Sequence, residues 1–92
     1  LHLELRDRLN PKKNPFFQRA EVVLFTAQRG DRVVGRCSAT IDREHLRVWN
    51  DDTGFFGFFD TVDDVEVARA LIDAAAGWLQ ARGMRRMLGP FS

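Results

Sequence analysis

The chain has 92 residues, a formal net charge of +1, 45% hydrophobic residues and 29% charged residues. This length allows one domain at most, and the composition is that of an ordinary folded protein, not of a disordered one. The nearly neutral charge gives no electrostatic reason to expect a nucleic acid or a membrane as a partner. The single cysteine, Cys37, excludes an intramolecular disulfide and favours a reducing compartment, so we expect a cytoplasmic protein.

The first twenty residues carry mixed signals. Leu1–Leu9 is compatible with a short helix, and Asn10–Ala20 is expected to be an entry loop. The prolines Pro11 and Pro15 oppose a continuous helix through this region, because proline removes a backbone donor and restricts the residue before it.

A β-hairpin is predicted next. Glu21–Arg29 is rich in β-branched and aromatic residues, which is typical of a strand. Gly30 and Asp31 predict a tight two-residue turn, and Arg32–Asp42 is the returning strand. In the returning strand every second residue is smaller and more apolar, so this set is expected to face the core: Val33, Gly35, Cys37, Ala39 and Ile41.

A third strand is predicted at Thr53–Phe59, after a polar segment, Arg43–Asp52, that is expected to be a loop or a short helical turn. The strand is nearly all apolar, which predicts cover on both faces of the sheet. Gly57 inside it predicts a bulge or a close backbone approach.

The segment 63–82 is the clearest helix in the chain. Asp63 is the predicted N-cap, Glu66 lies at the reciprocal capping-box position, and Gly83 suits the left-handed residue that ends a helix. Apolar residues recur at helical spacing and predict one buried stripe: Ala68, Leu71, Ile72, Ala75 and Leu79.

A last strand is predicted at 84–88. A helix that crosses from strand 53–59 to strand 84–88 makes this pair parallel, whereas the hairpin and its neighbour are antiparallel. The expected fold class is therefore α/β, in the sense of an α+β fold with a mixed sheet.

The strand–helix–strand unit resembles the centre of the GNAT superfamily of N-acetyltransferases. The similar segments extend over most of the chain: NPFF at 14–17, VVGR at 33–36, SATID at 38–42, GFFGFF at 54–59, LIDAAAGWLQARGM at 71–84 and GPF at 89–91. The resemblance implies a GNAT-like fold in which the strand at 53–59 is bulged and diverges from the strand at 84–88.

The resemblance also implies a co-substrate, acetyl-coenzyme A or another acyl-coenzyme A. The backbone at Phe58, Phe59 and Asp60 would then hold the pantetheine arm. The superfamily's pyrophosphate loop, aligned from the helix, places its basic position on Asp63, its first glycine on Glu66 and its last small residue on Ala68. Only Ala68 fits that pattern, so the loop is degenerate.

Three functions follow as expectations. The first is N-acyl transfer to a small-molecule or peptide amine by a single, incomplete domain at 1–92, whose catalytic residues lie beyond Ser92. The second is a non-catalytic GNAT-like module that binds a ligand or a protein. The third is a separate α+β domain that forms a homodimer through its open sheet edge.

Other candidate residues favour structural roles. Cys37 is expected to be a small buried hydrophobe, since no His or Lys stands beside it in the sequence to lower its pKa. His2 and His45 have no metal-ligand spacing, so no metal site is expected. A cluster of three arginines is expected to complement the helix C-terminus and to cover a solvated strand face: Arg82, Arg85 and Arg86.

Overall fold

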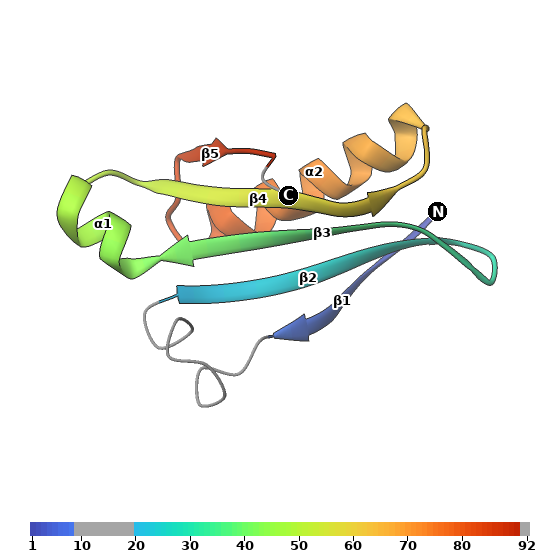
Figure 1. The fold of residues 1–92 in the computed structure, drawn as a ribbon, viewed down its shortest axis with the longest axis horizontal. Helices are drawn as coiled ribbons and strands as arrows, with labels where there is room; N and C mark the ends of the chain where they lie inside the picture. Colours follow the sequence, from blue (N-terminus) through green and yellow to red (C-terminus); the bar gives the residue numbers. More distant parts are fainter. Residues whose placement is uncertain (9–19, 91–92) are drawn as a thin grey trace.

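The computed structural model describes residues 1–8 and 20–90, without the side chains of residues 7, 8 and 59. Figure 1 shows a twisted sheet with a long helix along one face and a short helix at one end. The elements within the described residues are β1 (His2–Arg8), β2 (Ala20–Arg29), β3 (Arg32–Asp42), α1 (Arg43–Trp49), β4 (Thr53–Thr61), α2 (Val65–Ala81) and β5 (Arg86–Leu88). Among these residues, no helix combines the length and the apolarity that a membrane crossing requires.

The sheet has the strand order β1-β2-β3-β4-β5. Each neighbouring pair from β1 to β4 is antiparallel, and β5 runs parallel to β4 after the crossover through α2. The predicted α/β fold with a mixed sheet is therefore confirmed, as is the parallel final pair. We call the face of the sheet away from α2 the open face.

The core lies between α2 and the sheet. Val67, Leu71 and Leu79 of α2 are almost fully buried against residues of β2, β3 and β4. A Cβ atom on Gly54 of β4 would lie 2.6 Å from a methyl carbon of Leu79, so glycine lets the helix approach the sheet closely there. Gly35 of β3 has the same role, because its Cβ would lie 2.8 Å from Leu71.

The N-terminal segment is a strand and not the short helix that was expected. β1 pairs antiparallel with β2, and Leu3 packs against the core. The prediction was wrong because Leu3 and Leu5 alternate with charged residues, which is the period of a strand with one buried face. The expected entry loop lies almost entirely outside the described residues.

α1 begins at Arg43, the first residue of the predicted polar segment, whereas α2 begins one residue later than its predicted cap implies. α1 forms a true helix in the predicted polar segment, with Asp42 as its N-cap. The N-cap of α2 is Asp64 and not Asp63, and its carboxylate accepts a hydrogen bond from the amide of Glu66 at 2.9 Å. At the other end Gly83 has the predicted left-handed conformation, with φ +87°.

Three register shifts interrupt the ladder, and each leaves one extra residue on one strand: Arg6 on β1, Val34 on β3 and Phe59 on β4. The shift at Val34 corrects the predicted inward position of Val33, whose exposed fraction is 50%. The bulge in β4 lies at Phe59 and not at Gly57, because Gly57 pairs regularly with Ser38.

Pairing between β4 and β5 is short. Only Thr53, Gly54 and Phe55 of β4 have partners on β5 within the described residues. β5 ends before Gly89, where a Cβ atom would lie 2.3 Å from the carbonyl oxygen of Phe56, so only glycine fits at this approach.

Candidate functional site

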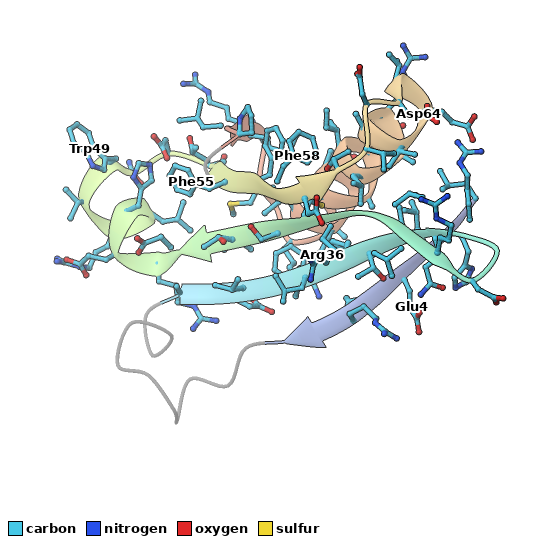
Figure 2. All side chains as sticks on the ribbon, turned by 45° about the vertical axis from the view of Figure 1, so that its right-hand side comes forward. Glu4, Arg36, Trp49, Phe55, Phe58 and Asp64 are labelled. Atoms are coloured by element: carbon cyan, nitrogen blue, oxygen red, sulfur yellow. The ribbon has the colours of Figure 1, made fainter. Side chains whose placement is uncertain are left out.

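A groove of about 830 Å³ lies on the open face of the sheet. Its lining residues come from four neighbouring strands, β1 to β4, and include both charged and apolar side chains. Figure 2 shows Arg36, one of the charged ones, on its strand. The lining residues are Arg6, Leu24, Phe25, Thr26, Val33, Arg36 and Asp60. Ligand sites of this size combine an apolar lining with a few polar groups, so this groove is the candidate site.

A polar row crosses the sheet at this groove. Glu4 pairs with Thr26, Thr26 with Arg36, and Arg36 with Asp60 in the strand register. Directly opposed residues of antiparallel strands point to the same face, so the four side chains share the open face. Arg36 Nη2 lies 3.5 Å from Asp60 Oδ2.

A second ion pair stands beside this row. Arg6 Nη1 lies 3.6 Å from Glu4 Oε2. Both the Arg6–Glu4 and the Arg36–Asp60 pairs are largely exposed and long, and exposed pairs of this kind contribute little to stability. Breaking either pair therefore costs little free energy.

Thr26 is the unusual member of the row. It is 6% exposed, and its hydroxyl oxygen has no hydrogen-bond partner among the described residues. Leaving a buried hydroxyl without a partner costs about 1–3 kcal/mol of folding free energy. A valine would fit the same strand position without this cost, and a ligand in the groove could supply the partner that the hydroxyl lacks.

A bulge brings Asp60 to the groove, whereas Arg6 reaches it by the ordinary alternation of β1. Arg6 follows Leu5, which pairs with the core residue Phe25, so Arg6 points to the open face beside Glu4. The extra residue at Phe59 lets Asp60 pair with Arg36 on the open face, whereas strict alternation from Phe58 would turn Asp60 towards α2.

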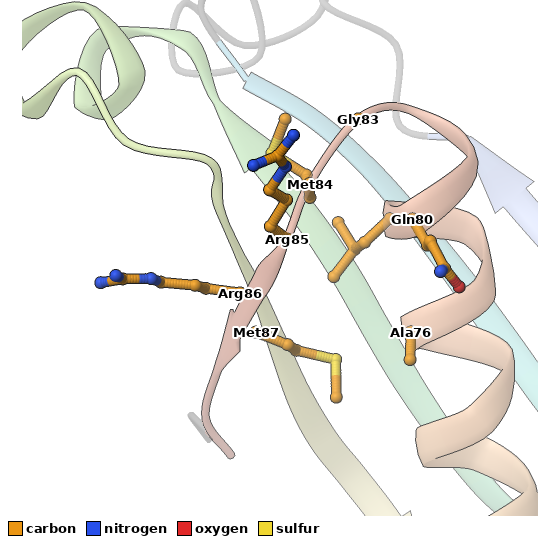
Figure 3. Close-up of a pocket in the computed structure, with 8 residues that line it drawn as sticks. Ala76, Gln80, Gly83, Met84, Arg85, Arg86 and Met87 are labelled. Atoms are coloured by element: carbon orange, nitrogen blue, oxygen red, sulfur yellow. The ribbon is translucent and has the colours of Figure 1, made fainter.

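A second cavity, of about 530 Å³, lies between the end of α2 and β5. Figure 3 shows Met87 pointing towards the helix and Arg86 pointing away from it. The three expected arginines do not form one surface here. Arg82 donates a hydrogen bond to the carbonyl of Trp78 near the helix C-terminus and stacks over the indole ring, as the prediction of a helix-end role requires. Arg85 lies 3.8 Å from Asp52.

A second polar cluster lies where α1 meets the open face. His45 Nε2 lies 3.2 Å from Asp51 Oδ1, without the alignment of a hydrogen bond. The imidazole ring also meets Phe55 of β4 edge to face, with 5.1 Å between ring centroids. Trp49 projects from α1 and is 68% exposed. Within residues 1–8 and 20–90, no group of three His, Cys, Asp or Glu side chains is placed to hold a metal ion.

The thiol of Cys37 is fully buried against α2 and donates a weak hydrogen bond to the carbonyl of Leu71 at 3.6 Å. Burial raises the pKa of this thiol to about 11, because the low-dielectric core disfavours the thiolate. The predicted role as a small buried hydrophobe is confirmed.

The four residues predicted to bind a coenzyme do not share one surface. Phe58 faces the core side and packs edge to face against Phe56, whereas Asp60 stands on the open face. Phe59 is the bulged residue, and only its backbone is described. The amide of Ala68 donates to the carbonyl of Asp64 within α2, so it is already used. Coenzyme binding by these residues stays a prediction.

The acidic start of α2 has a partner that sequence reasoning missed. Arg29 Nη2, at the tip of the hairpin, lies 3.1 Å from Asp64 and 3.3 Å from Glu66. The sequence separation of 35 residues gives no local signal for this contact. The start of α2 is thus capped by a carboxylate, and the carboxylates there are paired with a guanidinium group. This arrangement is that of a structural cap.

Two curated proteins are similar to the whole chain. A bacterial ceramide synthase from Caulobacter vibrioides is 46% identical over 93 residues, which make up 24% of that protein. The protein YghO from Escherichia coli is 37% identical over 92 residues, or 23% of its length. The chain thus spans about a quarter of the length of these relatives. No family model and no solved structure matches the chain.

These comparisons correct the expected family and function. The resemblance to GNAT acetyltransferases is overturned, because no family model matches and the similar proteins are named ceramide synthase and YghO. The expected coenzyme A-dependent acyltransferase, and the alternative of a non-catalytic GNAT-like module, are withdrawn with it. Strand–helix–strand units of this shape occur in many unrelated proteins, so the fold did not establish the family.

Proposed function

We propose that this chain is one structural unit of a ceramide synthase. The observation that carries the proposal is its 46% identity, over its full length, to the bacterial ceramide synthase of Caulobacter vibrioides. Because the chain corresponds to 24% of that protein, the complete activity requires residues outside this unit.

The chemistry of the product agrees with the open face. Ceramide joins a long-chain amino alcohol to a fatty acyl chain through an amide bond, so its synthase must hold long apolar chains beside polar groups. The groove offers apolar Leu24 and Val33 next to the donors of Thr26 and Arg36. An apolar lining with a few convergent polar groups is the usual composition of a small-molecule site.

Other properties of the complete protein remain proposals. A cytoplasmic location is supported by the one free and buried thiol, Cys37. Three further predictions concern the complete protein and can be tested on it: an acyl-coenzyme A co-substrate, an amine acceptor and a homodimer.

The test uses the protein that the complete gene encodes. We expect its expression in a bacterium that makes no sphingolipids, supplied with sphinganine, to produce ceramide that mass spectrometry detects in lipid extracts. The control is the same gene with a stop codon early in the reading frame. Full-length, folded protein that yields no more ceramide than this control would overturn the proposal.

A further inference from the structure

We propose that the open-face groove binds a long-chain fatty acyl group by its carbonyl or carboxylate end. The inference rests on the proposed function for the identity of the ligand, and it assigns one substrate class to one site. Its foundation is the set of polar groups in the groove, which are mainly hydrogen-bond donors.

Thr26 supplies the first donor. Its hydroxyl is buried, lines the groove and has no partner within the described part of the chain. A hydroxyl group can donate one hydrogen bond, and an acyl carbonyl oxygen is a suitable acceptor. A bound ligand would therefore satisfy a group that folding leaves without a partner.

Arg6 and Arg36 supply further donors at the rim. Their side chains are 53% and 54% exposed, and their contacts with Glu4 and Asp60 are long, at 3.6 and 3.5 Å. Each contact uses one terminal nitrogen, whereas a guanidinium group has five N–H donors. Both side chains can swing aside to admit a ligand and then hold its oxygen atoms.

The preference for an acceptor over an amine comes from the spare hydrogen-bond donors and not from the net charge. Three lining residues have charged side chains: Arg6 and Arg36 are positive, and Asp60 is negative. Glu4, which contacts Arg6, brings the whole cluster to neutrality. An ammonium group needs a carboxylate, but Glu4 and Asp60 both already contact an arginine. A carboxylate or carbonyl oxygen instead finds donors that are available.

The apolar part of the groove suits the acyl chain. Leu24 and Val33 stand beside the polar groups, and Val33 is 50% exposed, so its contact with an alkyl chain would remove apolar surface from water. The groove volume of about 830 Å³ lies within the usual range for small-molecule sites.

The experiment measures palmitate binding to the complete protein by calorimetry, below the aggregation concentration of palmitate. We expect Arg36→Gln to weaken binding on the order of ten-fold, and Thr26→Val to weaken it by roughly five-fold, because each removes a donor. Hexadecylamine, which has the same chain length and the opposite charge, should compete poorly for the site.

Matched variants separate binding from folding. Thr40→Val changes the same residue type on the same face but outside the groove lining, and Arg69→Gln makes the same charge change on α2. Both should bind palmitate like the wild type. Thr26→Val should also raise the urea midpoint of unfolding, since it removes a buried hydroxyl without a partner, so weaker binding cannot result from unfolding.

The outcomes distinguish this inference from the proposed function. Palmitate binding that is unchanged in Thr26→Val and Arg36→Gln, or equal competition by hexadecylamine, would refute the acyl site even if ceramide is formed. Binding that depends on both residues in a protein that makes no ceramide would support the acyl site and refute the proposed function.

Discussion

At Thr26, the requirements of folding and of ligand binding point in opposite directions. The residue stands in the middle of the sheet, between Glu4 and Arg36, with a buried hydroxyl that has no described partner. Its strand position suits any β-branched side chain. The strand was predicted correctly from its β-branched and aromatic residues. The place of Thr26 in the groove was not, because the threonine belongs to no motif and its neighbours across the sheet are distant in sequence.

The buried thiol of Cys37 makes stability depend on pH. Its pKa is about 11 in the folded protein, against 9.0 for the ordinary thiol. The folded state thus retains the proton at a pH where the unfolded state has lost it. The stabilisation is fully present below pH 9 and is lost as the pH rises through 11, by roughly 2–3 kcal/mol at most.

Urea unfolding of the complete protein at several pH values between 8 and 11 measures this loss. Cys37→Ala is the matched control, because it removes the titrating group and keeps a small apolar side chain. We expect the wild type to lose stability more steeply than the variant above pH 9. Parallel pH profiles for the two proteins would contradict the assignment.

At the scale of elements, the start of α2 shows how closely a cap can be predicted. The adjacent residues Asp63 and Asp64 both resemble an N-cap in sequence. In the structure the N-cap is Asp64. The Asp64 carboxylate accepts a hydrogen bond from the amide of Glu66 and also forms an ion pair with Arg29, which is distant in sequence. One residue of error is expected at a helix end, because the pattern fixes helix type better than its boundaries.

A pair of substitutions tests this cap. Asp64→Ala should destabilise the protein by about 1 kcal/mol through loss of the cap, with a smaller contribution from the exposed Arg29 contact. Asp63→Ala should have an effect within about 0.5 kcal/mol, since its side chain is exposed and Asp64 provides the cap. Chemical denaturation measures both, and equal losses would show that the two carboxylates share the capping role.

The strands show which local sequence patterns are sufficient to predict an element and its orientation. The hairpin turn at Gly30, with φ +58°, and the strand Arg32–Asp42 agree with the sequence prediction because turn chemistry and β-branched residues are local signals. β1 was missed, although Leu3 and Leu5 carried a strand period. The bulge at Val34 was missed because Val33 and Val34 are equally apolar, so the sequence does not show which one faces the core.

At the scale of the whole molecule, the topology was more predictable than the site. The crossover from β4 through α2 to a parallel β5 follows from general rules of chain handedness, and the structure confirms the parallel pair. The groove could not be predicted, because it joins residues of four strands whose register depends on the bulges. The family was not predictable either, since a common fold hosts many functions.

The bulge at Phe59 has a consequence for how this protein tolerates changes in length. The residues before and after it keep their partners on β3, so the ladder already treats Phe59 as a one-residue insertion. Deleting Phe59 should therefore leave a folded protein with the remaining pairs intact. Deleting Ala39, which pairs with Val23 on one side and with Phe56 on the other, should abolish folding.

Thermal unfolding of the two deletion variants of the complete protein would show the difference. The variant without Phe59 should unfold in one cooperative transition, and the variant without Ala39 should show none. If it is found, length changes among related chains should gather at the bulged positions Arg6, Val34 and Phe59, all of which lie along the strands that wall the groove. Insertions and deletions, more than substitutions, would then be the changes by which evolution reshapes this site.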